Sequence, residues 1–123
     1  MSKRKIFVSY DTAKDERLKE VFAKILERPD SPFVAAGYST PITEPVRTWE
    51  YNTGKAIQGC EIVIILTGPT TAQAPGVLKE VEMAFDEEIP MIQVLGYKNI
   101  KVNPIRRAGQ LIPWSWETLK NMV

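Results

Sequence analysis

Glu61-Ile-Val-Ile-Ile-Leu66 is the stretch that decides the fold. Its apolar residues follow one another without alternation, which is typical of a strand that is buried on both faces. Thr67-Gly-Pro-Thr-Thr71 comes directly after it and predicts a turn at the carboxyl end of that strand. Because strands covered on both faces belong to parallel sheets with helices on each side, this run predicts an α/β protein.

Strand and helix patterns alternate on both sides of this run. In chain order, the expected elements are a strand at Ile6–Tyr10, a helix after Asp11, a weaker strand at Phe33–Tyr38, a helix at Trp49–Gln58, the strand Glu61–Leu66, a helix at Val77–Glu87, a strand at Pro90–Leu95 and a closing helix at Trp114–Met122. Polar loops are expected at Ser39–Arg47 and Gly96–Gln110. Right-handed crossovers place the first and third strands side by side in the centre, with the second strand outside the first and the fourth outside the third. The chain, residues 1–123, is thus predicted to be a single domain with a small central parallel sheet, a flavodoxin-like three-layer sandwich.

Two helices carry apolar residues at helical spacing. In the first, the expected buried stripe is Leu18, Val21, Phe22, Ile25 and Leu26, with Asp11 as the N-cap residue. In the third, the expected apolar arc is Val77, Val81, Ala84 and Phe85, with Glu80 at its edge.

Composition excludes several classes of protein. The formal net charge is +1, which argues against a dedicated nucleic-acid binder. No apolar stretch approaches the length of a membrane span. Cys60 is the single cysteine, so an internal disulfide is excluded and a cytoplasmic location is expected. Packing as a small buried hydrophobe is the expected role of its side chain.

The chain contains no histidine. This excludes Ser-His-Asp and Cys-His nucleophile systems and the commonest zinc ligand, and no metal or cofactor is expected. Any chemistry must therefore use carboxylates, hydroxyls, Lys, Arg or the backbone.

Polar residues gather where the predicted strands end. In a doubly wound sheet ligands bind outside the carboxyl ends of the strands. That rule brings together Ser9, Tyr10, Asp11, Thr67, Gly68, Thr70, Thr71, Gly96 and Tyr97. Asp11 has the competing role of a helix cap, and a Gly-Pro-Thr-Thr turn requires no ligand.

Several segments in this order resemble the TIR superfamily, and in particular the TIR-like family associated with Thoeris anti-phage defence. They are Lys5-Ile-Phe-Val-Ser-Tyr-Asp11, Glu61–Thr71, Val77-Leu-Lys-Glu-Val-Glu-Met-Ala84 with Ile89-Pro-Met-Ile-Gln-Val94, and the closing Ile112-Pro-Trp-Ser-Trp116. The resemblance spans nearly the whole chain. It departs from the family at Gly76 and Val77, where many TIR proteins have Trp or Ser and then Cys.

The resemblance implies an enzyme that cleaves NAD at the nicotinamide–ribose bond, giving ADP-ribose or a cyclic ADP-ribose signal. Glu80 matches the catalytic glutamate of enzymatic TIR proteins. A single carboxylate suits this chemistry, because nicotinamide leaves as a neutral group and only the oxocarbenium-like ribosyl cation needs stabilising. The residues expected to contact the nucleotide are Ser9, Tyr10, Asp11, Arg47, Trp49, Thr67, Gly68 and Thr70.

Trp49 has a structural alternative, packing over the sheet edge, and Trp114 and Trp116 are expected to pack in the closing segment. The expected partners are a second TIR-like copy or a separate effector protein.

Other functions compete with this one. A phospho-receiver domain is excluded, because the strand Glu61–Leu66 is not followed by an Asp. A flavin carrier is disfavoured, since the turn after Ile6–Tyr10 lacks a hydroxyl- and glycine-rich phosphate loop. A nucleoside deoxyribosyltransferase also uses a glutamate on a similar fold. For Glu80 itself the structural alternative is a solvated side chain on the helix surface, because Glu is rarely buried. The main alternative function is a non-catalytic TIR-like interaction module.

Overall fold

The computed structural model describes residues 3–97, 100–113, 115 and 117. Within them the chain forms one sheet of five parallel strands in the order β2-β1-β3-β4-β5. The strands are β1 (Arg4–Ser9), β2 (Phe33–Tyr38), β3 (Ile62–Thr67), β4 (Met91–Leu95) and β5 (Gln110–Pro113). The predicted parallel sheet, with β1 and β3 adjacent in its centre, is confirmed.

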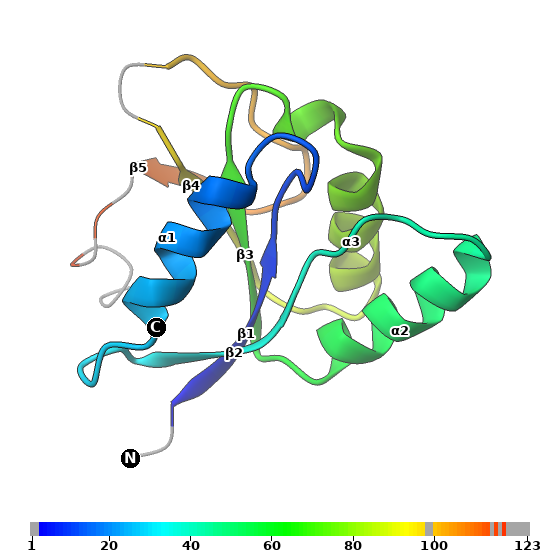
Figure 1. Ribbon diagram of the computed structural model, residues 1–123, viewed down its shortest axis with the longest axis horizontal. Helices are drawn as coiled ribbons and strands as arrows, with labels where there is room; N and C mark the ends of the chain where they lie inside the picture. Colours follow the sequence, from blue (N-terminus) through cyan, green and yellow to red (C-terminus); the bar gives the residue numbers. More distant parts are fainter. Residues whose placement is uncertain (1–2, 98–99, 114, 116, 118–123) are drawn as a thin grey trace.

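Helices cover both faces of the sheet (Figure 1). α1 (Glu16–Leu26) packs on one face, and α2 (Val46–Gln58) and α3 (Pro75–Asp86) pack on the other. A short 3-10 turn, η1 (Thr71–Gln73), precedes α3. The architecture is therefore the predicted flavodoxin-like three-layer sandwich. None of the helices in the described part of the chain has the length and apolar character needed to cross a membrane.

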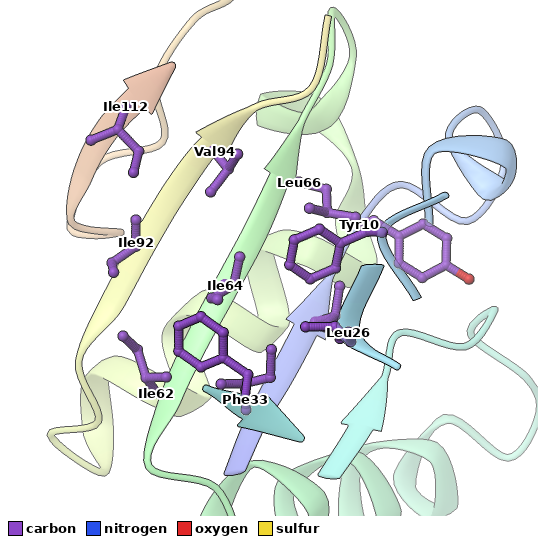
Figure 2. Packing of buried hydrophobic residues seen from close by; sticks show 12 residues of the cluster. Tyr10, Leu26, Phe33, Ile62, Ile64, Leu66, Ile92, Val94 and Ile112 are labelled. Carbon is purple, nitrogen blue, oxygen red and sulfur yellow. The ribbon is translucent and has the colours of Figure 1, made fainter. Parts of the chain in front are cut away.

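Each face of the sheet has its own core. Figure 2 shows the cluster on the α1 side, where Ile64 and Leu66 of β3 lie among residues of every other strand. On the opposite side Val63 and Ile65 pack against Val77 and Val81 of α3. All residues of β3 are buried, as its continuous apolar sequence predicts.

Three details of the predicted helices are wrong. α1 begins at Glu16 and is not capped by Asp11. Its buried residues are Phe22 and Leu26, and Val21, which was expected among them, is 54% exposed. In α3 Phe85 is 48% exposed, and the guanidinium of Arg107 lies 5.1 Å from its ring centre. The two helices therefore bury narrower faces than their apolar residues suggest.

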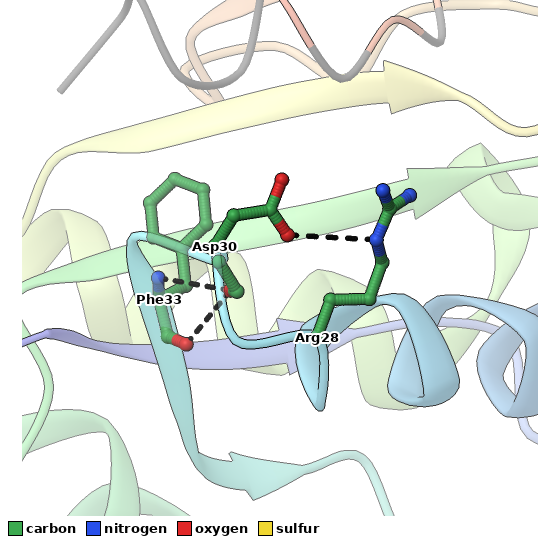
Figure 3. A network of polar contacts seen from close by, with 4 residues as sticks. Arg28, Asp30 and Phe33 are labelled. Atoms are coloured by element: carbon green, nitrogen blue, oxygen red, sulfur yellow. Dashed lines mark hydrogen bonds and ion pairs between the residues drawn. The ribbon is translucent and has the colours of Figure 1, made fainter.

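The connection from α1 to β2 is fixed by a local polar network (Figure 3). Ser31 Oγ donates to the carbonyl of Phe33 and accepts from its N–H, at 3.0 and 3.1 Å. Arg28 Nε lies 3.5 Å from Asp30 Oδ1. Buried Ser31 thus sets where β2 begins, and the predicted bounds Phe33–Tyr38 are confirmed.

A β-bulge interrupts the pairing of β1 with β2. Ile6 pairs with Ala35 but Phe7 pairs with Gly37, so β2 contains one extra residue. Side chains alternate between the two faces along a strand, and a shift of one residue exchanges those faces. Ala35 and Tyr38 consequently both pack on the α1 side, and Ser39 is directed to the α3 side.

The segment between β4 and β5 covers the α3 side of the sheet, where Ile105 and Ala108 join the core. Buried Gln93 of β4 holds it. Its amide accepts from the N–H of Ile105 at 2.7 Å and donates to the carbonyls of Ile105 and Gly109 at 3.0 and 2.9 Å. β5 was not predicted as a strand. The predicted helix Trp114–Met122 and the packing of Trp114 and Trp116 lie outside the described residues.

Candidate functional site

A pocket of about 200 Å³ opens at the carboxyl ends of β1 and β2, beside the start of α3. Three segments line it: residues 10–13 after β1, residues 39–42 after β2, and residues 74–77 at the start of α3. This is the edge of the sheet at which open α/β folds bind ligands.

Glu80 lies directly behind this pocket. Val77, Glu80, Val81 and Ala84 recur at helical spacing and form the buried face of α3, so Glu80 sits within the buried face and not at its edge. Its side chain is 0% exposed. Ser39 and Val77 line the pocket and Glu80 does not, and the hydroxyl of Ser39 links the pocket wall to the carboxylate.

Two hydroxyl groups hold one oxygen of this carboxylate. Ser9 Oγ donates to Glu80 Oε1 at 2.7 Å, and Ser39 Oγ donates to the same atom at 2.6 Å. Ser39 is fixed in turn, because its Oγ accepts from the N–H of Tyr10 at 3.0 Å. Glu80 Oε2 is buried and has no hydrogen-bond partner among the described residues. The carboxylate is therefore positioned through one oxygen, and the other has both lone pairs unused.

The environment of Glu80 favours its protonated form. Burial raises the pKa of Glu80 from 4.5 to about 7, although the hydrogen bonds from Ser39 and Ser9 act in the opposite direction. A carboxyl group with a pKa near 7 changes its charge within the physiological range. Burial together with a nearby pocket is the combination by which functional carboxylates are recognised.

Ser39 belongs to this site and was missed in the sequence, where it was assigned to a polar loop. The bulge in β2 is the reason, because without the extra residue strand alternation would direct Ser39 to the α1 side. One signal for it does exist. Strict alternation would place Gly37 on the same face as Phe33 and Ala35, but Tyr38 is the large apolar residue on that face. The alternation breaks at the small pair Ala36-Gly37, where the bulge lies.

Asp11 lines the pocket but does not cap α1, so the predicted N-cap is wrong. Its Oδ1 accepts from the N–H of Ala13 at 3.0 Å, which closes a local turn. Its Oδ2 accepts from Thr70 Oγ1 at 2.6 Å. Asp11 therefore ties the loop after β1 to the loop after β3.

The other residues expected after β3 have structural partners. Thr67 is buried and its Oγ1 donates to the carbonyl of Ile65 at 3.3 Å. The N–H of Gly68 donates to Thr71 Oγ1 at 2.7 Å. Thr67, Gly68, Thr70 and Thr71 thus form the turn, and none of them lines the pocket.

A second buried carboxylate, Asp15, lies against this turn. Tyr97 donates to Asp15 Oδ1 at 2.6 Å, and this bond and burial raise the pKa of Tyr97 to about 12. Asp15 Oδ2 has no hydrogen-bond partner among the described residues. A Cβ atom on Gly68 would stand 2.8 Å from this oxygen, so close packing and not an open pocket surrounds Asp15.

Arg47 and Trp49 are not brought to the pocket. Arg47 is exposed in the first turn of α2. Trp49 is buried, and its Nε1 donates to the carbonyl and hydroxyl of Thr40 at 3.1 and 3.2 Å. The indole thus packs within the fold and holds Thr40 in the segment after β2. Trp49 therefore has a structural role, as its stated alternative proposed.

Metal and thiol chemistry find no support in the described residues. They contain no group of three or more His, Cys, Asp or Glu side chains placed to hold a metal ion. Cys60 is buried, its thiol donates to the carbonyl of Ile57 at 3.0 Å, and burial raises its pKa. A thiol of this kind is inert at neutral pH, so Cys60 has the predicted structural role.

Comparison with known proteins adds no assignment to this geometry. No model of a known protein family matches the chain. A search of curated proteins finds no significant match either.

Proposed function

We propose that this chain is a TIR-like domain that cleaves NAD at the nicotinamide–ribose bond. The observation that carries the proposal is the buried Glu80 carboxylate, held by Ser9 and Ser39 directly behind the pocket at the strand ends. The motif resemblance supports the same residue. A role in cytoplasmic anti-phage defence signalling rests on that resemblance alone.

The proposed reaction needs a negative charge and no general acid. As the bond between C1′ and the pyridinium nitrogen breaks, its electron pair moves to the nitrogen and nicotinamide leaves as a neutral molecule. The ribosyl cation left behind is stabilised by the Glu80 carboxylate. Water captures the cation and releases a proton, which gives ADP-ribose; capture by a group of the substrate would give a cyclic product.

Glu80 Oε2 is the atom suited to face the cation, since Oε1 already accepts two hydrogen bonds. The side chain is covered in this structure, so the proposal requires Ser39 to rotate or the segment 39–42 to shift when substrate enters. Carboxylates that stabilise glycosyl cations act at close range, and such contacts often form only in the substrate complex.

The test is nicotinamide release from NAD by wild type, Glu80→Gln and Glu82→Gln across a series of protein concentrations. Glu82 is exposed on the same helix and is the matched control. Glu80→Gln keeps the shape and loses the charge, so we expect a fall in kcat of about 100- to 1,000-fold, with Glu82→Gln unchanged. Equal rates for wild type and Glu80→Gln would remove Glu80 from the mechanism.

A non-catalytic interaction module is the second candidate, and one surface favours it. Leu78 and Phe85 of α3 are 42% and 48% exposed and line a groove with Arg106 and Arg107. Apolar residues gathered beside charges are typical of contact surfaces. No nicotinamide release from protein shown by light scattering to be assembled would favour this candidate.

A further inference from the structure

The described residues that line the pocket in front of Glu80 include one acidic residue, Asp11, and no basic residue. Glu80 lies behind the pocket and is bonded to Ser39 of its wall. Among the residues that the structure describes, no Lys or Arg lines this pocket, and Arg47, the basic residue expected to contact the nucleotide, is not part of it. Proteins commonly hold phosphate groups with such basic side chains, so the pocket lacks the usual means of doing so.

The size of the pocket points in the same direction. Its volume of about 200 Å³ is below the range of roughly 300 to 1,000 Å³ usual for small-molecule sites. In the conformation described, the pocket is therefore small for a whole dinucleotide.

The wall also has the chemistry that one ring and one sugar require. Ile42, Pro75 and Val77 offer apolar surface to a flat ring. The hydroxyl of Ser39 and the carboxylate of Asp11 are hydrogen-bonding groups for ribose hydroxyls. The positive charge of a pyridinium ring is favoured beside Asp11 and Glu80, whereas a phosphate in the same place is repelled.

One feature opposes this selection. The first turn of α3 begins at the pocket, and the positive end of a helix dipole attracts anions. That end is equivalent to about half a unit charge, and Pro75 removes one of the N–H groups that would bind an anion. The full charge of Asp11, together with the charge on ionised Glu80, exceeds it.

We propose that this site selects the nicotinamide–ribosyl cation itself and makes no use of phosphate, so that unphosphorylated pyridinium ribosides are its preferred substrates. This inference rests on the proposed function, because it assumes that Glu80 promotes cleavage of the N-glycosidic bond. It changes the identity of the substrate that the pocket recognises.

The experiment compares nicotinamide release from nicotinamide riboside, nicotinamide mononucleotide and NAD by the same wild-type protein. We expect kcat/KM for the riboside to equal or exceed that for NAD, and to exceed that for the mononucleotide by about fivefold or more, because the 5′-phosphate of the latter stays close to Asp11. A higher kcat/KM for NAD or the mononucleotide than for the riboside overturns the inference and leaves the proposed function standing. Release from none of the three overturns both.

Asp11→Asn tests the source of the selection. The amide retains an acceptor for the N–H of Ala13 and a polar partner for Thr70, and it removes the charge. We expect the ratio of riboside to mononucleotide kcat/KM to fall toward one. An unchanged ratio overturns the role of Asp11, and the wild-type ranking decides the substrate class even if this variant does not fold.

Discussion

Glu80 should make the protein less stable as the pH rises toward neutrality. Burial raises the pKa of this carboxyl from 4.5 to about 7 in the folded state. Between these values the folded chain holds a proton that the unfolded chain has released. Stability therefore falls with increasing pH in this window: the favourable contribution is complete below pH 4.5 and is lost once the pH passes the folded pKa.

The size of the effect follows from the shift. Each pKa unit corresponds to about 1.4 kcal/mol, so the whole transition amounts to about 3 kcal/mol. Between about pH 5 and about pH 8 the free energy of unfolding should fall by about 2 to 3 kcal/mol because of Glu80 alone. That is a large part of the total stability of an ordinary domain, which is about 5 to 15 kcal/mol.

Denaturant unfolding of wild type, Glu80→Gln and Glu82→Gln at several pH values measures this quantity. Glu80→Gln buries an amide N–H₂ where Oε2 had no partner, and that cost is the same at every pH. The difference in unfolding free energy between Glu80→Gln and wild type should therefore shift by about 2 to 3 kcal/mol in favour of the variant from about pH 5 to about pH 8. Glu82→Gln should run parallel to wild type. A Glu80→Gln curve parallel to wild type would refute the reasoning.

Three further outcomes are expected. If ionised Glu80 stabilises the ribosyl cation, kcat/KM should rise with pH around its pKa of about 7, and a flat profile would contradict that role. Gly68→Ala places a Cβ 2.8 Å from Asp15 Oδ2 and should destabilise the protein by about 1 to 3 kcal/mol in urea unfolding, whereas Gly54→Ala, in an open position in α2, should stabilise it by about 0.5 to 1 kcal/mol. Gln93→Met leaves the N–H of Ile105 without its partner and should cost about 3 kcal/mol of unfolding free energy, with faster hydrogen exchange at that amide. Hydrogen exchange as slow as in wild type would show that Gln93 does not hold the segment between β4 and β5.

The order of the first four strands was predictable because it depends on signals that are local and strong. Continuous apolar runs such as Ile62–Thr67 identify buried parallel strands without any knowledge of their neighbours. The rule of right-handed crossovers then leaves few arrangements. β5 was not predicted as a strand, because Gln110–Pro113 is short, has one buried residue and ends in Pro, and such a sequence resembles a loop.

The details of the candidate site depend on tertiary packing and were predicted less well. Glu80 was selected by resemblance, but its complete burial could not be read from a helix in which Phe85 seemed to belong to the buried face. Ser39 reaches Glu80 only because one extra residue in β2 reverses the alternation. Asp11 was assigned to a helix that begins at Glu16, since an Asp that closes a turn and an Asp that caps a helix look alike in sequence.

The hydrogen bonds around Glu80 explain how one residue can be costly to the fold and suited to chemistry. A Met or Leu at this position would fill the same face of α3 with Val77, Val81 and Ala84 and would avoid the cost of burying a charge at neutral pH, although the hydroxyls of Ser9 and Ser39 would lose their acceptor. The two hydroxyl donors lower the pKa of Glu80 but do not cancel the effect of burial, so ionisation stays unfavourable until a positive charge arrives. The ribosyl cation formed beside Oε2 would supply that charge. The carboxylate would then interact more strongly with the transition state than with the bound substrate. On this argument the incomplete solvation of Glu80 is what the proposed reaction uses, and the cost in stability and the gain in rate have one physical origin.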